Sequence, residues 1–330
     1  MNILSICRHI QEREGEVGIE IEVEGNQLPD AVVGWRREED GSLRGESCEY
    51  VLRRPCKREQ VGEYLSRITK GYEDNSSYIT ESARQSIHIH INVQDMSLTE
   101  VYSFIVLFLI YETSLVNYCG GDRVGNLFCL RSSDAEYLLS SLEAAASPSR
   151  FHRLDTDQLR YSALNVVSLF KFGSLEFRSM RGTSNFEMVE KWVGLLLRLK
   201  DMAKQAHNPL SLVSEYRDIG VEAFTEKMLG EWAGVVTEQQ GWQWNTKLGM
   251  RNIRAIAYSG DWEGLSGEQA ITQPSFSIPA ESMFRAIEGE SAGVRRERLL
   301  AALTATTTIQ SFEEEEEEPE EEEENEEWQS

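Results

Sequence analysis

Cysteines, basic residues and long apolar runs are all scarce in this sequence of 330 residues, and each scarcity excludes a class of protein. The five cysteines are an odd number without a Cys-x-x-Cys pair, so neither a disulfide framework nor a zinc ribbon has support. The longest uncharged apolar stretch, 101–111, is too short to span a bilayer. The first 14 residues include Arg8 and lack a continuous apolar core, so they do not resemble a signal peptide. We therefore expect a reduced cytoplasmic protein with no membrane partner.

The shortage of basic residues argues against nucleic acid as a partner. The chain has 33 Lys and Arg against 56 Asp and Glu, a net charge of −23. Thirteen of the acidic residues are glutamates between Glu313 and Glu327, and without them the net charge is still −10. Affinity for a phosphate backbone comes mainly from Lys and Arg, so we expect no general binding of DNA or RNA.

What is present is typical of a folded globular protein, with 40% hydrophobic and 27% charged residues. A run that is apolar nearly all round predicts a buried helix over 98–118. Apolar residues at helical spacing predict a second helix over 187–206, and Ser184 and Glu187 have the spacing of a capping box at its start.

The C-terminal third has a different character. Amphipathic patterns predict helices over 215–239 and 281–305, separated by a stretch containing Gly and Ser at 259–279. The segment from Glu313 onward is expected to be disordered, because like charges repel one another and almost nothing apolar remains to be buried.

Three short segments alternate apolar and polar residues, which is the pattern of a strand with one buried face. These segments are 17–24, 87–93 and 174–178. Their polar faces carry Glu20, Glu22 and Glu24 on the first, His88, His90 and Asn92 on the second, and Glu176 and Arg178 on the third.

A half-solvated antiparallel strand is the ordinary explanation for any one of these segments. Taken together they favour a metal site, because adjacent like charges on a strand face are mildly destabilising. Glu and His are also residues that hold divalent cations. Residues on one strand face lie about 6.6 Å apart, so Glu20 and Glu22 could each serve one metal of a pair. Both explanations remain open on the pattern alone.

Seven pieces of sequence occur in an order typical of one family. They are Gly18-Ile19-Glu20-Ile21-Glu22, Asp40-Gly41-Ser42-Leu43 with Cys48-Glu49-Tyr50-Val51, Ser86-Ile87-His88-Ile89-His90, Arg123-x-x-Asn126-x-Phe128-Cys129, Arg160-Tyr161-x-x-x-Asn165, Ser174-Leu175-Glu176-Phe177-Arg178 and Gly182-Thr183-x-Asn185. Over about residues 15–205 the chain resembles the amidoligases of the glutamine synthetase-like carboxylate–amine ligase superfamily, which bacteriophages often carry. Two departures are Ser174, where the family usually has Thr, and Ser86, where a Gly is common.

The resemblance implies an α+β fold. In it a curved antiparallel sheet holds the active site on its concave face and helices on its convex face. We expect an amidoligase-like catalytic domain over 1–210, a helical accessory region over 211–308 and a disordered acidic tail over 309–330. If a phage encodes the protein, the compartment is the host cytoplasm.

The resemblance also implies the chemistry. ATP phosphorylates a carboxylate and an amine attacks the acyl phosphate, so the cofactors are ATP and Mg²⁺, with Mn²⁺ as a substitute. The partners are an amino acid, peptide or protein carrying a carboxylate, and an amine. Neither a P-loop nor Gly-x-Gly-x-x-Gly is present, which excludes little because this superfamily binds ATP between metals and sheet.

Roles follow residue by residue from the same resemblance. The metal ligands are Glu20, Glu22, Glu49, His88 and Glu176. The residues that act on the reaction are Arg178, which offsets charge on the transferring phosphoryl group, His90, which contacts nucleotide or takes the amine proton, and Glu49. The candidates for binding phosphate or a substrate carboxylate are Arg123, Arg160 and Arg181, for each of which a surface salt bridge is an equal alternative.

Two other functions are compatible with these residues. One is a catalytically silent scaffold or inhibitor that acts through the acidic tail. The other is a metal-dependent hydrolase, in which a metal-bound water replaces a protein nucleophile. Neither the substrates nor the oligomeric state follows from the sequence.

Overall fold

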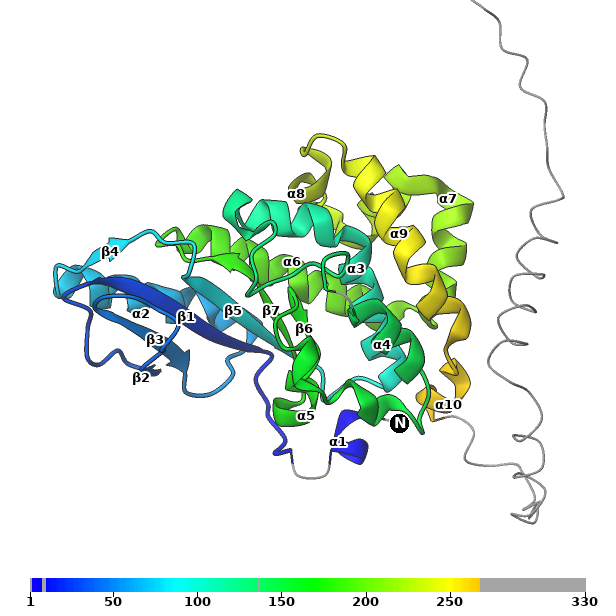
Figure 1. Ribbon diagram of the computed structural model, residues 1–330, viewed down its shortest axis with the longest axis horizontal. Helices are drawn as coiled ribbons and strands as arrows, with labels where there is room; N and C mark the ends of the chain where they lie inside the picture. The colour runs from blue at the N-terminus through cyan, green and yellow to red at the C-terminus, as the bar shows by residue number, and fades with distance from the viewer. Residues whose placement is uncertain (1, 8–9, 136, 268–330) are drawn as a thin grey trace, which may run out of the picture. The chain divides into compact units, whose positions relative to one another are not determined.

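The computed structural model describes residues 2–7, 10–135 and 137–267 (Figure 1). The predicted helix over 281–305 and the predicted tail over 309–330 lie outside the described residues. The fold is α+β, as predicted, with a mostly antiparallel open sheet and helices.

The sheet has seven strands, and the six on its main path run in the order β2-β3-β1-β5-β7-β6 with every neighbouring pair antiparallel. Strand β4 pairs with the end of β1. The strands are β1 Val17–Asn26, β2 Trp35–Glu38, β3 Ser47–Leu52, β4 Tyr78–Thr80, β5 Ser86–Asn92, β6 Leu164–Asn165 and β7 Ser174–Arg181. The three segments expected from alternation therefore form β1, β5 and β7 in the middle of the sheet.

The apolar face of the sheet is the core. Ile19 of β1 pairs with Ile89 of β5, and Ile89 pairs with Phe177 of β7, all fully or almost fully buried. Paired residues in a ladder point to the same face, so the alternation places apolar side chains on one face and charged side chains on the other.

Three helices pack against this core. They are α2 Val61–Asp74, α3 Leu98–Cys119 and α6 Phe186–Gln205. Phe104 and Phe108 of α3 lie with ring centroids 5.5 and 5.0 Å from Phe177 of β7. In Figure 1, α2 and α6 lie behind the strands, so the long helices leave the charged face of the middle strands uncovered. The end of the short helix α5, Ser168–Phe172, lies at that face, where the Phe172 ring is 5.7 Å from the ring of His90.

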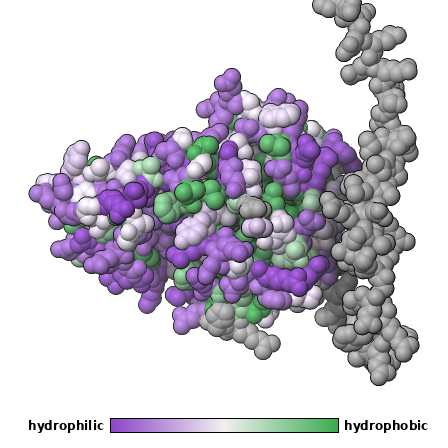
Figure 2. Space-filling model, in the orientation of Figure 1, coloured by the Kyte–Doolittle hydropathy of each residue, from purple (hydrophilic) through white to green (hydrophobic). Residues whose placement is uncertain are grey.

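The predicted helix over 98–118 is confirmed as α3. Ser97 and Glu100 form a capping box at its start, and Gly120 ends it with φ +143°. Nearly all of its residues are buried, so its length and apolarity reflect a core helix and are consistent with a soluble protein. In agreement, Figure 2 shows that the visible surface is mostly hydrophilic.

The predicted start of the second helix is wrong by one residue, because the N-cap is Asn185 and not Ser184. The Asn185 side chain, rather than Ser184, accepts a hydrogen bond from the Met188 amide, and the helix begins at Phe186. Asn and Ser are equally good caps. The Asn185 cap begins the helix with Phe186, which is buried together with Val189.

The helices that follow pack onto α3. They are α7 Pro209–Leu229, α8 Gly234–Thr237, α9 Trp242–Ser259 and α10 Trp262–Ser266. The predicted helix over 215–239 is wrong in its bounds, because Asn208 caps a start at Pro209 and the left-handed Gly220 interrupts the helix. The helices α2 and α9 were not predicted. All described residues belong to one compact unit, so position 210 falls inside that unit.

Shorter elements complete the described part. They are the helices α1 Ile3–Ile6, α4 Leu138–Ala145 and α5 Ser168–Phe172, and the 3-10 turns Arg58–Gln60, Gly121–Arg123, Phe151–Leu154, Asp157–Leu159 and Gly230–Trp232.

Candidate metal centre

The register of the sheet brings the charged positions of four strands together on one face. The directly opposed pairs are Glu20 with His88, Glu22 with Glu49, and His90 with Glu176. Opposed side chains in an antiparallel pair lie close together. Five sequence-predicted metal ligands and His90 therefore converge, although they are up to 156 positions apart in the chain.

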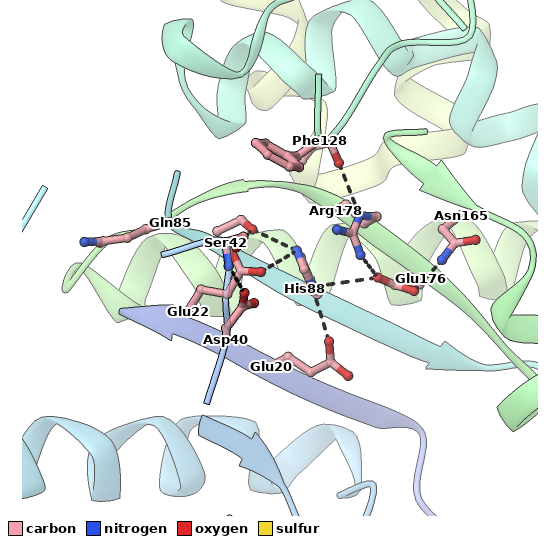
Figure 3. A network of polar contacts seen from close by, with 12 residues as sticks. Glu20, Glu22, Asp40, Ser42, Gln85, His88, Phe128, Asn165, Glu176 and Arg178 are labelled. Atoms are coloured by element: carbon pink, nitrogen blue, oxygen red, sulfur yellow. Dashed lines mark hydrogen bonds and ion pairs between the residues drawn. The ribbon is translucent and has the colours of Figure 1, made fainter. Parts of the chain in front are cut away.

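His88 is the centre of this cluster and is 3% exposed. Its Nδ1 lies 3.2 Å from an oxygen of Glu20 and 3.7 Å from an oxygen of Glu176. Its Nε2 lies 3.7 Å from Glu22 and 2.8 Å from the Ser86 hydroxyl, which donates to Glu22 at 2.5 Å (Figure 3). One imidazole thus contacts carboxylates of two neighbouring strands.

Glu20 lies between the two histidines. Its second oxygen is 3.3 Å from Nε2 of His90. Burial opposes ionisation of Glu20, but the imidazoles of His90 and His88 outweigh burial and hold the pKa of Glu20 well below its usual range. Burial lowers the pKa of His90, but the carboxylates of Glu20 and Glu176 raise it by more, so the net shift is upward.

Arg178 and Asn165 hold the Glu176 carboxylate. An Arg178 guanidinium nitrogen lies 2.5 Å from one oxygen, and the Asn165 amide donates to the other at 2.7 Å. Arg178 is itself fixed by donating to the Phe128 carbonyl at 3.2 Å. A β-bulge opposite His88 separates the β5–β7 pairing into two registers, and Arg178 stands at this bulge. Arg178 therefore points at the cluster beside Glu176 (Figure 3).

Glu49 is in the opposite situation, because it makes no hydrogen bond or ion pair with any described residue. Burial is the largest influence on it, and the nearby carboxylates of Glu20, Glu22 and Asp40 add to it, raising the pKa of Glu49 to about 8. Asp40 lies in the β2–β3 turn, where its carboxylate accepts from the Ser42 amide at 2.7 Å.

Three overlapping sets of side chains place one ligand atom each within 4.8 Å of one another. They are Glu20, Glu49 and His88; Glu20, His90 and Glu176; and Glu22, Asp40 and Glu49. Carboxylate oxygens and imidazole nitrogens suit Mg²⁺ and Mn²⁺. Because Glu20 and Glu49 each belong to two sets, the arrangement has the ligands for two neighbouring cations.

The three arginines proposed as anion contacts lie outside this cluster. Arg123 is 1% exposed, and its guanidinium donates to the backbone carbonyls of Ala83, Gln85, Arg178 and Ser179. Those bonds occupy its donors and hold the bulge of β7. Arg160 is exposed over the ring of Tyr161, and the exposed Arg181 packs beside Gly120 at the end of α3.

Sequence reasoning missed three groups of the cluster, namely Asp40, Ser86 and Asn165. Each stands in one of the motifs on which the family resemblance rests, so a signal was present. Only the paired strands show that Ser86 donates to Glu22 and that Asn165 orients Glu176.

A cleft of about 460 Å³ opens beside the Glu20 and His90 end of the cluster. Its size is within the range of about 300–1,000 Å³ that small-ligand sites occupy. Its charged lining residues are Arg13, Glu20, Arg36, Arg53, His90 and Lys171.

No protein-family model matches this sequence, and no curated protein is significantly similar to it.

Proposed function

We propose that this protein is an ATP- and divalent-metal-dependent carboxylate–amine ligase of the cytoplasm with a glutamine synthetase-like fold. The fold proposal is supported by the antiparallel sheet, whose charged face the long helices α2, α3 and α6 leave uncovered. The activity proposal is supported by the cluster on that face together with the family resemblance of its motifs.

The observation that carries the proposal is the imbalance of charge around Glu49. Five carboxylates, those of Glu20, Glu22, Asp40, Glu49 and Glu176, gather around one permanent cation, Arg178. Like charges at these distances repel one another, and without a counter-ion one of them retains a proton. Burial is the largest cause of the raised pKa of Glu49, and this repulsion adds to it. Two divalent cations would replace the proton and neutralise the five carboxylates together with Arg178, so the residues fit Mg²⁺ or Mn²⁺.

Each group of the cluster has a role in this proposal. Glu20, Glu22, Glu49, His88 and Glu176 would hold the metal ions, with Asp40 as a further ligand. The bound ions would supply charge neutralisation for the phosphates of ATP. Ser86 and Asn165 orient the ligands Glu22 and Glu176 through the hydrogen bonds described above.

The reaction balances as two displacements. A substrate carboxylate oxygen attacks the γ-phosphorus of ATP, and the bond to ADP breaks. The amine nitrogen then attacks the acyl carbon, phosphate leaves with the bonding electrons, and the nitrogen loses a proton. Arg178 would offset the charge that develops on the phosphoryl group, and His90, which lines the cleft, would accept the proton.

The test is stabilisation and product formation by the purified full chain. Wild type in millimolar Mg²⁺ and ATP should melt at a higher temperature than in EDTA, because a ligand of the folded state stabilises it. Glu20→Ala and Glu176→Ala should remove most of that gain, whereas Glu143→Gln, on the exposed face of α4, should keep it. Supplying carboxylate and amine pools should then release ADP together with an amide.

Other products identify the rival functions. Hydrolysis without amide formation would replace the ligase with a metal-dependent hydrolase. No stabilisation and no product would favour a silent scaffold.

A further inference from the structure

The cleft beside the cluster has a charge opposite to that of the molecule. The chain carries a net charge of −23, yet the cleft is lined by Arg13, Arg36, Arg53 and Lys171 and by a single acidic residue, Glu20. A rim of cations focuses the local potential and attracts anions that the rest of the molecule repels.

Two of these cations have no competing partner in the part of the chain that the structure describes. The side chains of Arg13 and Lys171 are exposed and make no hydrogen bond or ion pair with the described residues. Arg53 uses its Nε to donate to the Trp35 carbonyl at 2.9 Å, which leaves its terminal nitrogens available. Arg36 pairs with Glu38 and is partly neutralised. The free positive charge is therefore concentrated at Arg13, Lys171 and Arg53.

The rim is held in place by the buried side chain of Gln94. Its amide nitrogen donates to the carbonyls of Gln11 at 3.1 Å and Phe172 at 3.0 Å, and its oxygen accepts from the Arg13 amide at 2.9 Å. Gly173, with φ +70°, lets the chain turn against Gln94. This clamp joins the segment carrying Arg13 to the end of α5, which carries Lys171, so both cations are anchored next to His90.

The lining of the cleft suits a ligand whose negative charges are several residues apart better than it suits a compact triphosphate. Phosphate sites commonly use backbone amides at the start of a helix. Among the described residues, no helix of eight or more residues begins at this cleft. The cations stand instead on separate elements, and apolar side chains such as Phe172, Pro55 and Ile10 lie among them.

We propose that the cleft binds an acidic peptide. One carboxylate of the peptide reaches the Glu20 and His90 end of the metal centre, and further carboxylates pair with Arg13, Lys171 and Arg53. This inference rests on the proposed ligase function and names its carboxylate substrate as a peptide with several acidic side chains.

The test uses fluorescein-labelled hexaglutamate and fluorescence anisotropy with the full chain in millimolar Mg²⁺. Arg13→Ala/Lys171→Ala should weaken binding roughly tenfold, which corresponds to 1.4 kcal/mol. The matched control Arg54→Ala/Lys70→Ala removes the same charge from exposed positions outside the cleft lining and should bind like wild type. The charge-conserving variant Arg13→Lys/Lys171→Arg should restore binding. Wild-type affinity should fall as salt is added, because exposed ion pairs are screened.

Three results would overturn the inference. The first is equal peptide affinity in Arg13→Ala/Lys171→Ala (the rim variant) and in Arg54→Ala/Lys70→Ala (the control variant). The second is loss of affinity for a fluorescent ATP analogue, with peptide binding intact, in the rim variant. The third is competition by free glutamate as effective as by the peptide. Peptide binding by a protein that Mg²⁺ and ATP do not stabilise would instead refute the ligase and leave the cleft as a peptide site.

Discussion

At the scale of the residue, the environment of each carboxylate decides its state. The imidazoles of His90 and His88 outweigh burial and lower the pKa of Glu20, and together with Arg178 they lower the pKa of Glu176. Glu49 has the same side chain on a neighbouring strand, but burial and the nearby carboxylates both raise its pKa, to about 8. Carboxylates with such different proton affinities on one sheet face mark a site arranged for a cation.

Replacing Glu49 by Gln should separate the effect of this residue on the stability of the metal-free protein from its effect on Mg²⁺ binding. The folded-state pKa lies above the usual value, so metal-free wild type loses stability as pH rises from about 4.5 towards 8. Glu49→Gln should be as stable as wild type or more stable at pH 8 in EDTA. It should gain little from Mg²⁺, as read by thermal melting. A gain equal to that of wild type would remove Glu49 from the ligand set.

Arg178 should affect turnover more than binding. In Arg178→Ala we expect kcat to fall by about 10²–10³, the usual effect of removing one group that stabilises transition-state charge. Stabilisation by Mg²⁺ should persist, because the ligands remain and lose a nearby positive charge. Steady-state kinetics beside the exposed control Arg153→Ala would show this, and an unchanged kcat would contradict it.

At the scale of the element, α3 carries a buried acid, Glu112, that has no part in the cluster. Glu112 is 3% exposed, and its carboxylate accepts from the amide of Ser132 at 2.9 and 3.0 Å and from the Ser132 hydroxyl. Burial raises the pKa of Glu112 to about 7, although these donors oppose the shift. The interaction fixes the loop after Cys129 to the core helix.

This acid should produce a pH dependence of stability. The folded state holds the Glu112 proton more tightly than the unfolded state, so stability should fall as pH rises from about 4.5 to about 7. The loss is roughly 3 kcal/mol at most. Glu112→Gln keeps an acceptor for Ser132 and should reduce the loss of stability between pH 5 and pH 8, as measured by urea denaturation. Glu143→Gln should retain the wild-type slope, and a Glu112→Gln slope equal to it would refute the assignment.

At the scale of the whole molecule, the C-terminal helices and the sheet share one core. Helix α9 crosses α3 so closely that a Cβ on Gly249 would lie 2.2 Å from the carbonyl oxygen of Ile110. The Tyr111 hydroxyl also lies 3.4 Å from the hydroxyl of Thr225 on α7. Such contacts predict cooperative unfolding of the described region.

Gly249→Ala tests that cooperativity. Forcing a methyl group against backbone should destabilise the protein by about 1–3 kcal/mol. The loss should appear in one transition that is coincident by circular dichroism and tryptophan fluorescence. Gly41→Ala, where the added methyl meets nothing within 4 Å, should be neutral. Two separate transitions in Gly249→Ala would show that the helices after residue 210 unfold as a domain of their own.

The sequence by itself determined three of the strands that carry the cluster, β1, β5 and β7, and the buried helix α3. Period-two alternation and an all-round apolar run are local patterns, and they predicted β1, β5, β7 and α3 with their faces. The same patterns placed Glu20, His88, Glu176 and Arg178 on polar faces.

Only the tertiary structure decided which of these groups meet, because strand register and bulges depend on the pairing of distant segments. Pairing leaves Glu49 without a partner among the residues that the structure describes, brings in Asp40 and Asn165, and turns Arg123 away to hold backbone carbonyls. The cleft also required the fold, since its cations Arg13, Arg53 and Lys171 come from segments that no local pattern connects.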